Sequence, residues 1–444
     1  MTQIPRWALQ RIVELAKSTK PTCIKFSDML KFGANPKPTH LLASSQFLSH
    51  EIPVRLAHRF HEMGSLPYNI SQLEVVKKVK SWYAKSFQEL VEFGEQLEIK
   101  RLNPDAAGPA ENQKKPFFPS ILSTGRQEYD EMSPLAAFAE KNGMSDIPQL
   151  NGRDYFGDIK EAHIVKHAEE YNERFARILR GIVERHNPAV LTAAQAVNKL
   201  RHSHPQVFQD VVGLQQFLDR FHGNRLAIRI LIGHHASLIL QKQSSPNRVG
   251  IVNTRMDPGD VASDAAVDAA EKCEETLGVA PRVEIQCPVG GCPHMTFVPS
   301  HLHHVLFEVL KNSMRAVVEK EEQKVGFGNA ERNNMPPIVV SIIEPSSQQI
   351  QIRISDQGVG ISAENLPRLF TYAFTTAKAV DIDEHFSGDE VHAPLAGFGY
   401  GLPLSRLYVK YFNGSLWIES TENVGTDVTI LLRKSFDGTE TFTY

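Results

Sequence analysis

The sequence predicts two domains, an all-α antiparallel helix bundle followed by an α+β sandwich. Three observations lead to this fold class. The chain has 444 residues, which is more than one ordinary hydrophobic core holds. Apolar residues recur with helical spacing through most of residues 1–245. Residues 246–444 instead mix short alternating strands with helices, without the regular strand–helix alternation of a doubly wound sheet.

The first domain, 1–245, is expected to contain long helices with short connections, which favours antiparallel packing. Six prolines and several glycines interrupt the pattern at about 100–155, so we expect an inserted surface segment there. The turn-forming run Ser244–Asn247 marks the expected end of the domain. Helices are predicted at 47–63, 70–93, 162–185, 188–201, 205–220 and 224–242.

The second domain is expected to begin with a strand at 248–252 and a helix at 261–277. A strand at 281–285 precedes a helix that starts after Pro299. Two later pairs of segments alternate apolar and polar residues, as the strands of hairpins do. These segments are 338–343 with 349–355 and 416–420 with 427–432, separated by a helix at 402–412.

The composition argues against several kinds of protein. A net charge of −3 gives no reason to expect a nucleic-acid partner. No apolar run reaches the length of about 18 residues that a membrane-spanning helix needs. Four cysteines in a chain of this length indicate a reducing compartment. Cys287, Cys292 and His294 supply at most three zinc ligands, so a plain loop with free thiols is favoured over a metal site.

The helix after Pro299 carries a narrow polar stripe on an otherwise apolar surface, which suggests the wall of a polar pocket. A carboxylate one turn after an imidazole can act as a general base. An amide oxygen one turn later can bind a hard cation such as Mg²⁺, and basic side chains can neutralise phosphate oxygens. A half-buried helix with satisfied ion pairs explains the stripe equally well. The stripe consists of His304, Glu308, Lys311, Asn312 and Arg315.

Two glycine-containing motifs follow this helix. Asp356–Gly360, with the pattern D-x-G-x-G, comes directly after a strand, where the Asp can accept a hydrogen bond from an amine such as that of adenine. Its glycines allow a flat base to approach the backbone. Gly397–Leu402 places alternate glycines before a helix, so that backbone N–H groups can surround an anion. Each motif alone is weak, since Asp-Gly pairs mark turns and glycine runs form linkers.

The order of these features carries more weight than any one of them. An acidic stretch between the motifs, at about 375–397, is expected to form a mobile lid over a nucleotide. Gly425-Thr426-Asp427 completes the order before the last strand. The Walker-A motif and the signature motifs of ordinary protein kinases are absent from the sequence, so phosphate binding must use another scheme.

This order resembles the ATP-binding fold shared by histidine kinases, heat-shock ninety chaperones, type II topoisomerases and mismatch-repair ATPases. The second domain is therefore expected to be a sandwich of the histidine-kinase-like ATPase type. More narrowly, the chain is similar to the mitochondrial 2-oxoacid dehydrogenase kinases, which act on pyruvate or branched-chain 2-oxoacid dehydrogenase. The matching stretches cover both domains except about 100–155, and they are Glu51–His58, Phe217–Phe221, Val298–Glu319 and Gly397–Tyr411.

The resemblance implies a protein serine kinase that uses ATP and Mg²⁺. Glu308 would deprotonate the substrate serine, His304 would tune it, and Lys311 would lie near the phosphates. Asn312 would hold Mg²⁺, and Asp356 would bind adenine. The full set of implied ATP-binding residues is Glu308, Asn312, Arg315, Asp356, Gly358, Gly360, Thr375, Thr376, Gly397, Phe398, Gly399, Tyr400, Gly401, Leu402 and Thr426.

The resemblance also implies partners and a location. The substrate would be the E1 alpha subunit, in the mitochondrial matrix, and the kinase would be a homodimer without nucleic-acid binding or membrane insertion. The first 20 residues are basic, which weakly fits an import signal and equally fits a basic helix. His186 lies in an Arg-His-Asn triplet that the family places near the active cleft. A pocket for the lipoyl group of the E2 core would be lined by Ile24, Met29, Phe32 and Phe47, although core packing explains these four equally well.

The substrate and the class of activity each leave alternatives open. Three features resemble the branched-chain enzyme: the short end after the last strand, the run Phe374–Ala377 and the run Ala280–Val283. His294–Leu302 and Phe217–Phe221 resemble the pyruvate enzyme, which we expect this chain to be. A more remote alternative is an ATP-gated conformational ATPase without a protein substrate. A non-catalytic adaptor is disfavoured because the polar stripe is intact.

Overall fold

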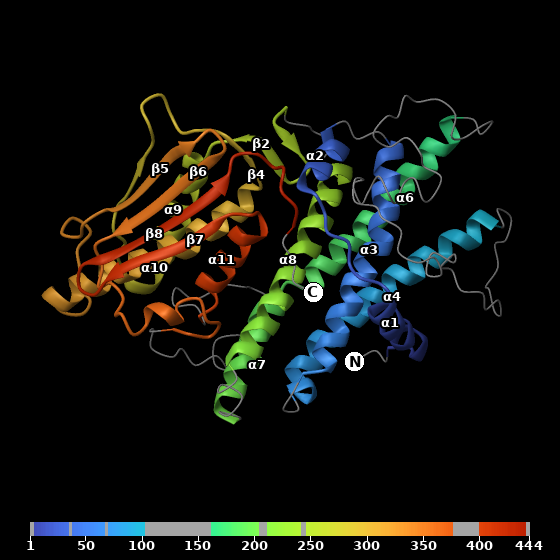
Figure 1. The fold of residues 1–444 in the computed structure, drawn as a ribbon, viewed down its shortest axis with the longest axis horizontal. Helices are drawn as coiled ribbons and strands as arrows, with labels where there is room; N and C mark the ends of the chain where they lie inside the picture. The colour runs from blue at the N-terminus through green and yellow to red at the C-terminus, as the bar shows by residue number, and fades with distance from the viewer. Residues whose placement is uncertain are drawn as a thin grey trace. The chain divides into compact units, whose positions relative to one another are not determined.

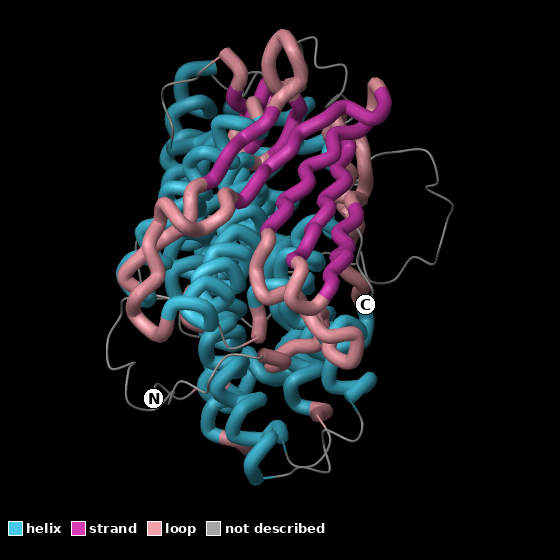
Figure 2. Tube along the Cα trace, turned by 90° about the vertical axis from the view of Figure 1, so that its left-hand side faces the viewer, coloured by secondary structure: helices cyan, strands magenta, loops and turns pink. Residues whose placement is uncertain are grey.

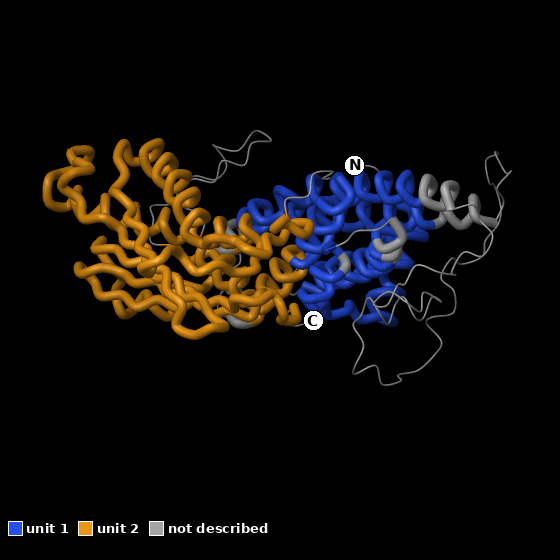
Figure 3. The backbone as a smooth tube through the Cα atoms, turned by 90° about the horizontal axis from the view of Figure 1, so that it is seen from above, with its two compact units in different colours: residues 1–196, 227–243 blue, residues 197–226, 244–444 orange. Residues whose placement is uncertain are grey.

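The structure is a computed structural model that describes residues 4–34, 38–66, 70–102, 161–203, 211–240, 246–375 and 399–440. These residues form two compact units, which Figure 3 colours separately. Unit 1 comprises Met1–Ala196 and Ala227–Gln243, and unit 2 comprises Val197–Leu226 and Ser244–Tyr444. The expected insertion at 100–155 lies outside the described residues from 103 onward.

Unit 1 is built from helices, as the sequence predicts (Figure 1). Its core comes from apolar residues that recur at helical spacing, such as Ile52 and Leu56 on one helix and Tyr83, Phe87 and Leu90 on another, all at most 1% exposed. The helices are α1 (Arg6–Ser18), α2 (Phe26–Ala34), α3 (Pro38–Gly64), η1 (Ile70–Gln72), α4 (Glu74–Leu102) and α6 (Glu161–Arg185), with most of α7 (Ala189–Ser203) and part of α8 (Val211–Leu240).

Helix α8 corrects one sequence prediction. Two helices are expected, at 205–220 and 224–242, but α8 runs unbroken from Val211 to Leu240. The expected break contains Gly223, and a glycine inside a helix costs about 1 kcal/mol relative to alanine. Its neighbours His222 and Asn224 are both buried, so packing holds the helix together where the local sequence does not.

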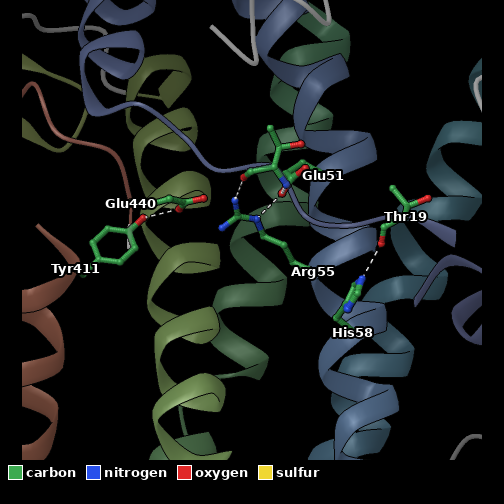
Figure 4. A network of polar contacts seen from close by, with 7 residues as sticks. Thr19, Glu51, Arg55, His58, Tyr411 and Glu440 are labelled. Carbon is green, nitrogen blue, oxygen red and sulfur yellow. Dashed lines mark hydrogen bonds and ion pairs between the residues drawn. The ribbon is translucent and has the colours of Figure 1, made fainter. Parts of the chain in front are cut away.

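A buried charge network anchors the chain before α2 to helix α3 (Figure 4). Glu51 and Arg55 lie one turn apart on α3, and the Arg55 Nε is 2.6 Å from the Glu51 Oε1. Arg55 Nη2 also donates to the Thr22 carbonyl at 2.6 Å, while the Thr22 N–H donates to Glu51 at 3.0 Å. Each charge therefore has several partners, which a buried ion pair needs in order to be tolerated. This network gives a structural reason for the glutamate and the arginine in the run Glu51–His58.

Unit 2 contains a five-stranded sheet with the order β3-β5-β6-β8-β7. Figure 2 shows its strands side by side in magenta, and in Figure 1 helices α9, α10 and α11 lie behind the sheet. β3 and β5 are parallel, and the other neighbours are antiparallel, so both predicted hairpins are confirmed. The elements are β3 (Val283–Gln286), β5 (Ile338–Ser346), β6 (Gln349–Asp356), β7 (Ser415–Thr421), β8 (Gly425–Arg433), α9 (Pro258–Leu277), α10 (Pro299–Val325), η4 (Leu366–Arg368) and α11 (Gly401–Tyr411).

A smaller sheet in unit 2 differs from the sequence prediction. The strand predicted at 248–252 is two strands, β1 (Arg248–Val249) and β2 (Val252–Met256), separated by a turn at Gly250 with φ 58°. β2 also pairs with β4 (Met295–Phe297), a three-residue strand that the sequence does not predict. A strand this short has too few alternating residues to show a period of two.

The expectation of free thiols at Cys287 and Cys292 is wrong, because the structure joins the two in a disulfide. The pair lies against the first turn of α9, where a Cβ on Gly259 would be 2.7 Å from the Cys292 Sγ. The other two cysteines, Cys23 and Cys273, take no part in a disulfide among the described residues. Within the described ranges, no group of three or more acidic, His or Cys side chains forms a metal site, and no helix is long and apolar enough to cross a membrane.

Candidate active site

Helix α10 positions the polar stripe. Pro299 stands in its first turn, where the missing N–H costs no hydrogen bond, and the helix ends before Gly326, which has φ 93°. Leu302, Leu306 and Leu310 on this helix are at most 1% exposed, which fixes α10 in the core of unit 2. The polar residues between these anchors therefore have defined positions.

Glu308 and Lys311 form a buried ion pair on α10. The Lys311 Nζ is 2.9 Å from the Glu308 Oε1, and the two residues are 2% and 9% exposed, respectively. The ammonium also lies 5.1 Å from the centre of the Phe307 ring. Such a pair is costly to bury and gives little net stability, so its position on a core helix favours a chemical role.

His304 lies one turn before Glu308 and is half-buried. Burial lowers its pKa, whereas the Glu308 carboxylate raises it, and the overall direction is downward. Its ring packs on Tyr408, with centroids 4.9 Å apart, and its Nε2 has no hydrogen-bond partner among the described residues. His304 is therefore neutral at physiological pH and can orient Glu308 without adding a positive charge.

The remaining two residues of the stripe differ from each other. Asn312 is exposed, which leaves its amide oxygen accessible to a ligand. Arg315 donates to Glu319 at 2.7 Å, four residues along the same helix. The sequence places Arg315 near the phosphates, but in this structure its partner is Glu319. That carboxylate is only half-buried, so a stronger anion can replace it.

Asp356 ends β6 and is 7% exposed. Burial raises the pKa of Asp356, while hydrogen bonds from the Gly358 N–H, the Ser313 hydroxyl and the Thr426 N–H lower it. The contact with Gly358 measures 2.9 Å. These donors hold the carboxylate in one orientation. The sequence singles out Asp356 and Gly358 but not Ser313, because a serine inside a helix carries no signal of its distant partner.

The glycines of D-x-G-x-G are required by close backbone contacts. A Cβ on Gly358 would lie 2.6 Å from the Ala316 Cβ on α10. Gly360 has φ 65° and approaches the Thr421 carbonyl too closely for a side chain. Thr426 is placed beside Asp356 by the β6–β8 pairing, and its hydroxyl is 2.8 Å from the Ser420 Oγ. The motif therefore joins helix α10 to the end of the sheet.

The glycine run brings the start of α11 to Glu308. Gly401 is the first residue of α11, and a Cβ on it would clash with the Glu308 Oε2. The first turn of a helix presents free N–H groups and a partial positive charge, which suits a phosphate. Tyr400 is the buried N-cap residue of α11, and Leu402 is half-buried. The structure thus places the predicted base beside a predicted anion site.

Some predicted residues cannot be placed. Thr376, Gly397 and Phe398 lie outside the described residues, as does nearly all of the expected lid at 375–397. Thr375 is described and exposed. Gly399 is described, with φ 75°.

In unit 1, three of the four expected lipoyl-pocket residues are buried. Ile24, Met29 and Phe47 are 1%, 4% and 5% exposed. The side chain of Phe32 lies outside the described set. His186 is also buried, and it stacks on Tyr83 with ring centroids 4.5 Å apart.

Comparison with known proteins identifies the family. A profile described as mitochondrial branched-chain alpha-ketoacid dehydrogenase kinase matches residues 23–253, and one described as histidine kinase-, DNA gyrase B-, and HSP90-like ATPase matches 297–435. The mitochondrial pyruvate dehydrogenase (acetyl-transferring) kinase of Arabidopsis thaliana is 32% identical, over 95% of this chain and 93% of that protein. The chain belongs to the mitochondrial alpha-ketoacid dehydrogenase kinase family.

Two further relatives carry the same kind of name. The Schizosaccharomyces pombe pyruvate dehydrogenase kinase is 31% identical, over 97% of this chain and 98% of its own length. The mitochondrial pyruvate dehydrogenase kinase isozyme 3 of Homo sapiens is 31% identical, over 96% of this chain and 87% of its own length. The resemblance read from the motifs is therefore confirmed, and so are the two-domain fold class, the protein-kinase class and the use of ATP. The ATPase match spans α10, β5 to β8 and α11, the elements that form the candidate site of this kinase.

Proposed function

We propose that this kinase transfers the terminal phosphate of ATP to a serine of the E1 alpha subunit of the mitochondrial pyruvate dehydrogenase complex, and so inactivates it. The observation that best supports this function is the position of the Glu308 carboxylate against the first turn of α11. A general base and an anion site must be adjacent if a hydroxyl is to attack a bound phosphate.

Glu308 accepts the proton of the substrate serine as its oxygen attacks the terminal phosphorus. Neutral His304 orients the carboxylate, and Lys311 stabilises negative charge beside it at 2.9 Å. Asp356 accepts a hydrogen bond from the adenine amine. The first turn of α11 and Arg315 bind phosphate oxygens. Because α10 carries the base and the start of α11 carries the anion site, the serine hydroxyl and the terminal phosphate are held next to each other.

Mg²⁺ fits the exposed side chain of Asn312, whose amide oxygen is the hard donor that this ion prefers. Asn312 follows Glu308 by one helical turn, so an ion held there lies on the same face of α10. When bound, Mg²⁺ neutralises phosphate charge.

Unit 1 is proposed to dock the kinase onto its complex. The buried apolar residues Ile24, Met29 and Phe47 support a lipoyl pocket, and ordinary core packing remains the alternative explanation. The two domains are proposed to be 1–245 and 246–444. We further propose that the kinase forms a homodimer and acts in the mitochondrial matrix, as its resemblance to mitochondrial kinases implies.

The choice of pyruvate dehydrogenase rests on the relatives at 31–32% identity, all of which carry that name, whereas the family profile over 23–253 names the branched-chain enzyme. Parallel incubation with radiolabelled ATP and each purified dehydrogenase complex decides between them. We expect label on the E1 alpha serine of pyruvate dehydrogenase together with loss of its activity. Label on the branched-chain complex alone would transfer the proposal to that substrate, and ATP hydrolysis without labelled protein would support the conformational ATPase.

A further inference from the structure

Residues 373 and 374 contact Gly399 of the glycine run, just before α11. The Ala373 N–H donates to the Gly399 carbonyl at 3.1 Å. Gly399 lies so close to Phe374 that a Cβ would clash with the Phe374 carbonyl oxygen. Because Gly401 begins α11 two residues later, against Glu308, whatever holds 372–374 in place also positions the first turn of α11.

Helix α8 holds this junction through Tyr372. The Tyr372 hydroxyl donates to the Asp219 Oδ1 at 2.9 Å, and the Tyr372 N–H donates to the Gln215 Oε1 at 2.7 Å. Gln215 and Asp219 lie one turn apart, so both bonds come from one face of α8. Tyr372 is 2% exposed, and burial, followed by the Asp219 charge, raises its pKa, so the hydroxyl stays protonated and remains a donor.

A third residue of the same helix fills the space between the two sides of the junction. The His222 ring stacks on Tyr372 with centroids 5.3 Å apart and meets the edge of Tyr400 at 5.7 Å. Neither ring nitrogen of His222 has a hydrogen-bond partner among the described residues. Full burial lowers the pKa of His222 to about 3, so it acts as a neutral aromatic side chain.

Asp219 also acts on α11 itself. Burial lowers the pKa of Arg406 on α11, while the charges of Asp219 and Tyr372 raise it, which places the carboxylate within electrostatic reach of this guanidinium. The guanidinium lies 4.1 Å from the centre of the Phe370 ring. The charge of Asp219 therefore influences α11 as well as the junction.

We propose that Asp219 and Tyr372 are positioning residues for nucleotide binding: their hydrogen bond holds the first turn of α11 in register with Glu308. This inference rests on the proposed function, because it assigns the start of α11 to the phosphates. Neither residue touches the reacting groups. Their effect passes through the Ala373–Gly399 bond and through Tyr400, the N-cap residue of α11.

Tyr372→Phe and Asp219→Asn test the role without changing side-chain size. ADP affinity is measured by titration calorimetry, and KM for ATP and kcat are measured on the dehydrogenase complex. A hydrogen bond to a charged group stabilises enough to predict about a tenfold rise in both the ADP Kd and the KM for ATP, with a smaller change in kcat. The double variant should lose less affinity than the sum of the two single losses, because Tyr372→Phe removes the donor of the hydrogen bond and Asp219→Asn removes the charge of its acceptor.

Tyr411→Phe is the matched control, because the buried Tyr411 hydroxyl also donates to a carboxylate, that of Glu440, at 3.0 Å (Figure 4). The Glu440 carboxylate is buried, whereas Asp219 is exposed. It should lower the melting temperature as Tyr372→Phe does but leave the ADP Kd unchanged. Equal loss of ADP affinity in both would show a merely structural role, and wild-type affinity in Tyr372→Phe and Asp219→Asn would overturn the inference. If Tyr372→Phe fails to fold, Asp219→Asn alone decides. A wild-type protein that binds no ADP would instead overturn the proposed function.

Discussion

At the scale of the residue, helix α10 contains two ion pairs with the same i,i+3 spacing, one in the polar stripe and one beyond it. Glu308 pairs with Lys311 and Glu321 pairs with Lys324, and both glutamates are buried. They differ in what they face, since Glu308 meets the first turn of α11. The neighbouring Lys324 is exposed at the end of the helix, whereas Lys311 is buried. The Glu308–Lys311 pair is therefore placed for a catalytic role, and the Glu321–Lys324 pair serves as a control for substitutions of a buried glutamate on the same helix.

Glu308→Gln should reduce phosphate transfer by about 100- to 10,000-fold, the range that a general base contributes. Transfer is measured with radiolabelled ATP on the dehydrogenase complex. ADP affinity should change little, because the amide preserves shape. Glu321→Gln, the control, should retain transfer. Near-normal transfer by Glu308→Gln would show that another group accepts the proton.

The position of a residue could be predicted from the sequence where the helix, strand or turn that carries the residue determines it. Glu308 lies against Gly401, and Asp356 accepts a hydrogen bond from Gly358 of its own motif. Their roles in binding ATP stay predictions. The contacts of Ser313 with Asp356 and of Tyr372 with α8 were not predicted, because they join segments far apart in sequence. Such pairings depend on tertiary packing, which no single motif records.

At the scale of the element, the start of α11 has little space beside Glu308. Gly401→Ala places a methyl group against the Glu308 Oε2. The carboxylate is the end of a flexible side chain, so it can move away at little cost in stability, but it then leaves the reacting position. We expect kcat to fall by about tenfold or more, as displacements near 1 Å can cause.

The control for Gly401→Ala is Gly181→Ala in α6, where an added Cβ meets nothing within 4 Å. That change should stabilise the protein by about 0.5–1 kcal/mol through the better helix propensity of alanine, with kcat unchanged. Steady-state kinetics and chemical denaturation of both variants check the pair. A normal kcat in Gly401→Ala would mean that the contact with Glu308 has no catalytic consequence.

The elements with strong periodicity were predictable, and those shaped by their neighbours were not. The two hairpins alternate clearly, and the start of α10 is marked by Pro299. The continuity of α8 through Gly223 and the existence of β4 depend on packing and pairing with other segments.

At the scale of the whole molecule, stability should fall in mild acid. Burial lowers the pKa of His222 to about 3, of His234 to about 4 and of His235 to about 3. Below the unfolded value of 6.5 the unfolded chain binds protons that the folded chain does not, so stability is full above that pH and is lost as pH falls towards the folded values. Each histidine should contribute a loss of about 1 kcal/mol per pH unit.

Urea unfolding at several pH values between neutrality and mild acid measures this loss. His234→Gln should flatten the pH dependence, whereas replacing the exposed His61 should not. Stability that stays constant across the window would contradict the burial of these three imidazoles.

The two units divide the proposed work, with docking in unit 1 and phosphate transfer in unit 2. The central claim concerns unit 2, where three elements form one nucleotide site. A crystal structure with Mg²⁺ and a non-hydrolysable ATP analogue tests it most directly. We expect adenine on Asp356, phosphates at the first turn of α11 and the metal beside Asn312. Nucleotide bound anywhere else on the chain would contradict it.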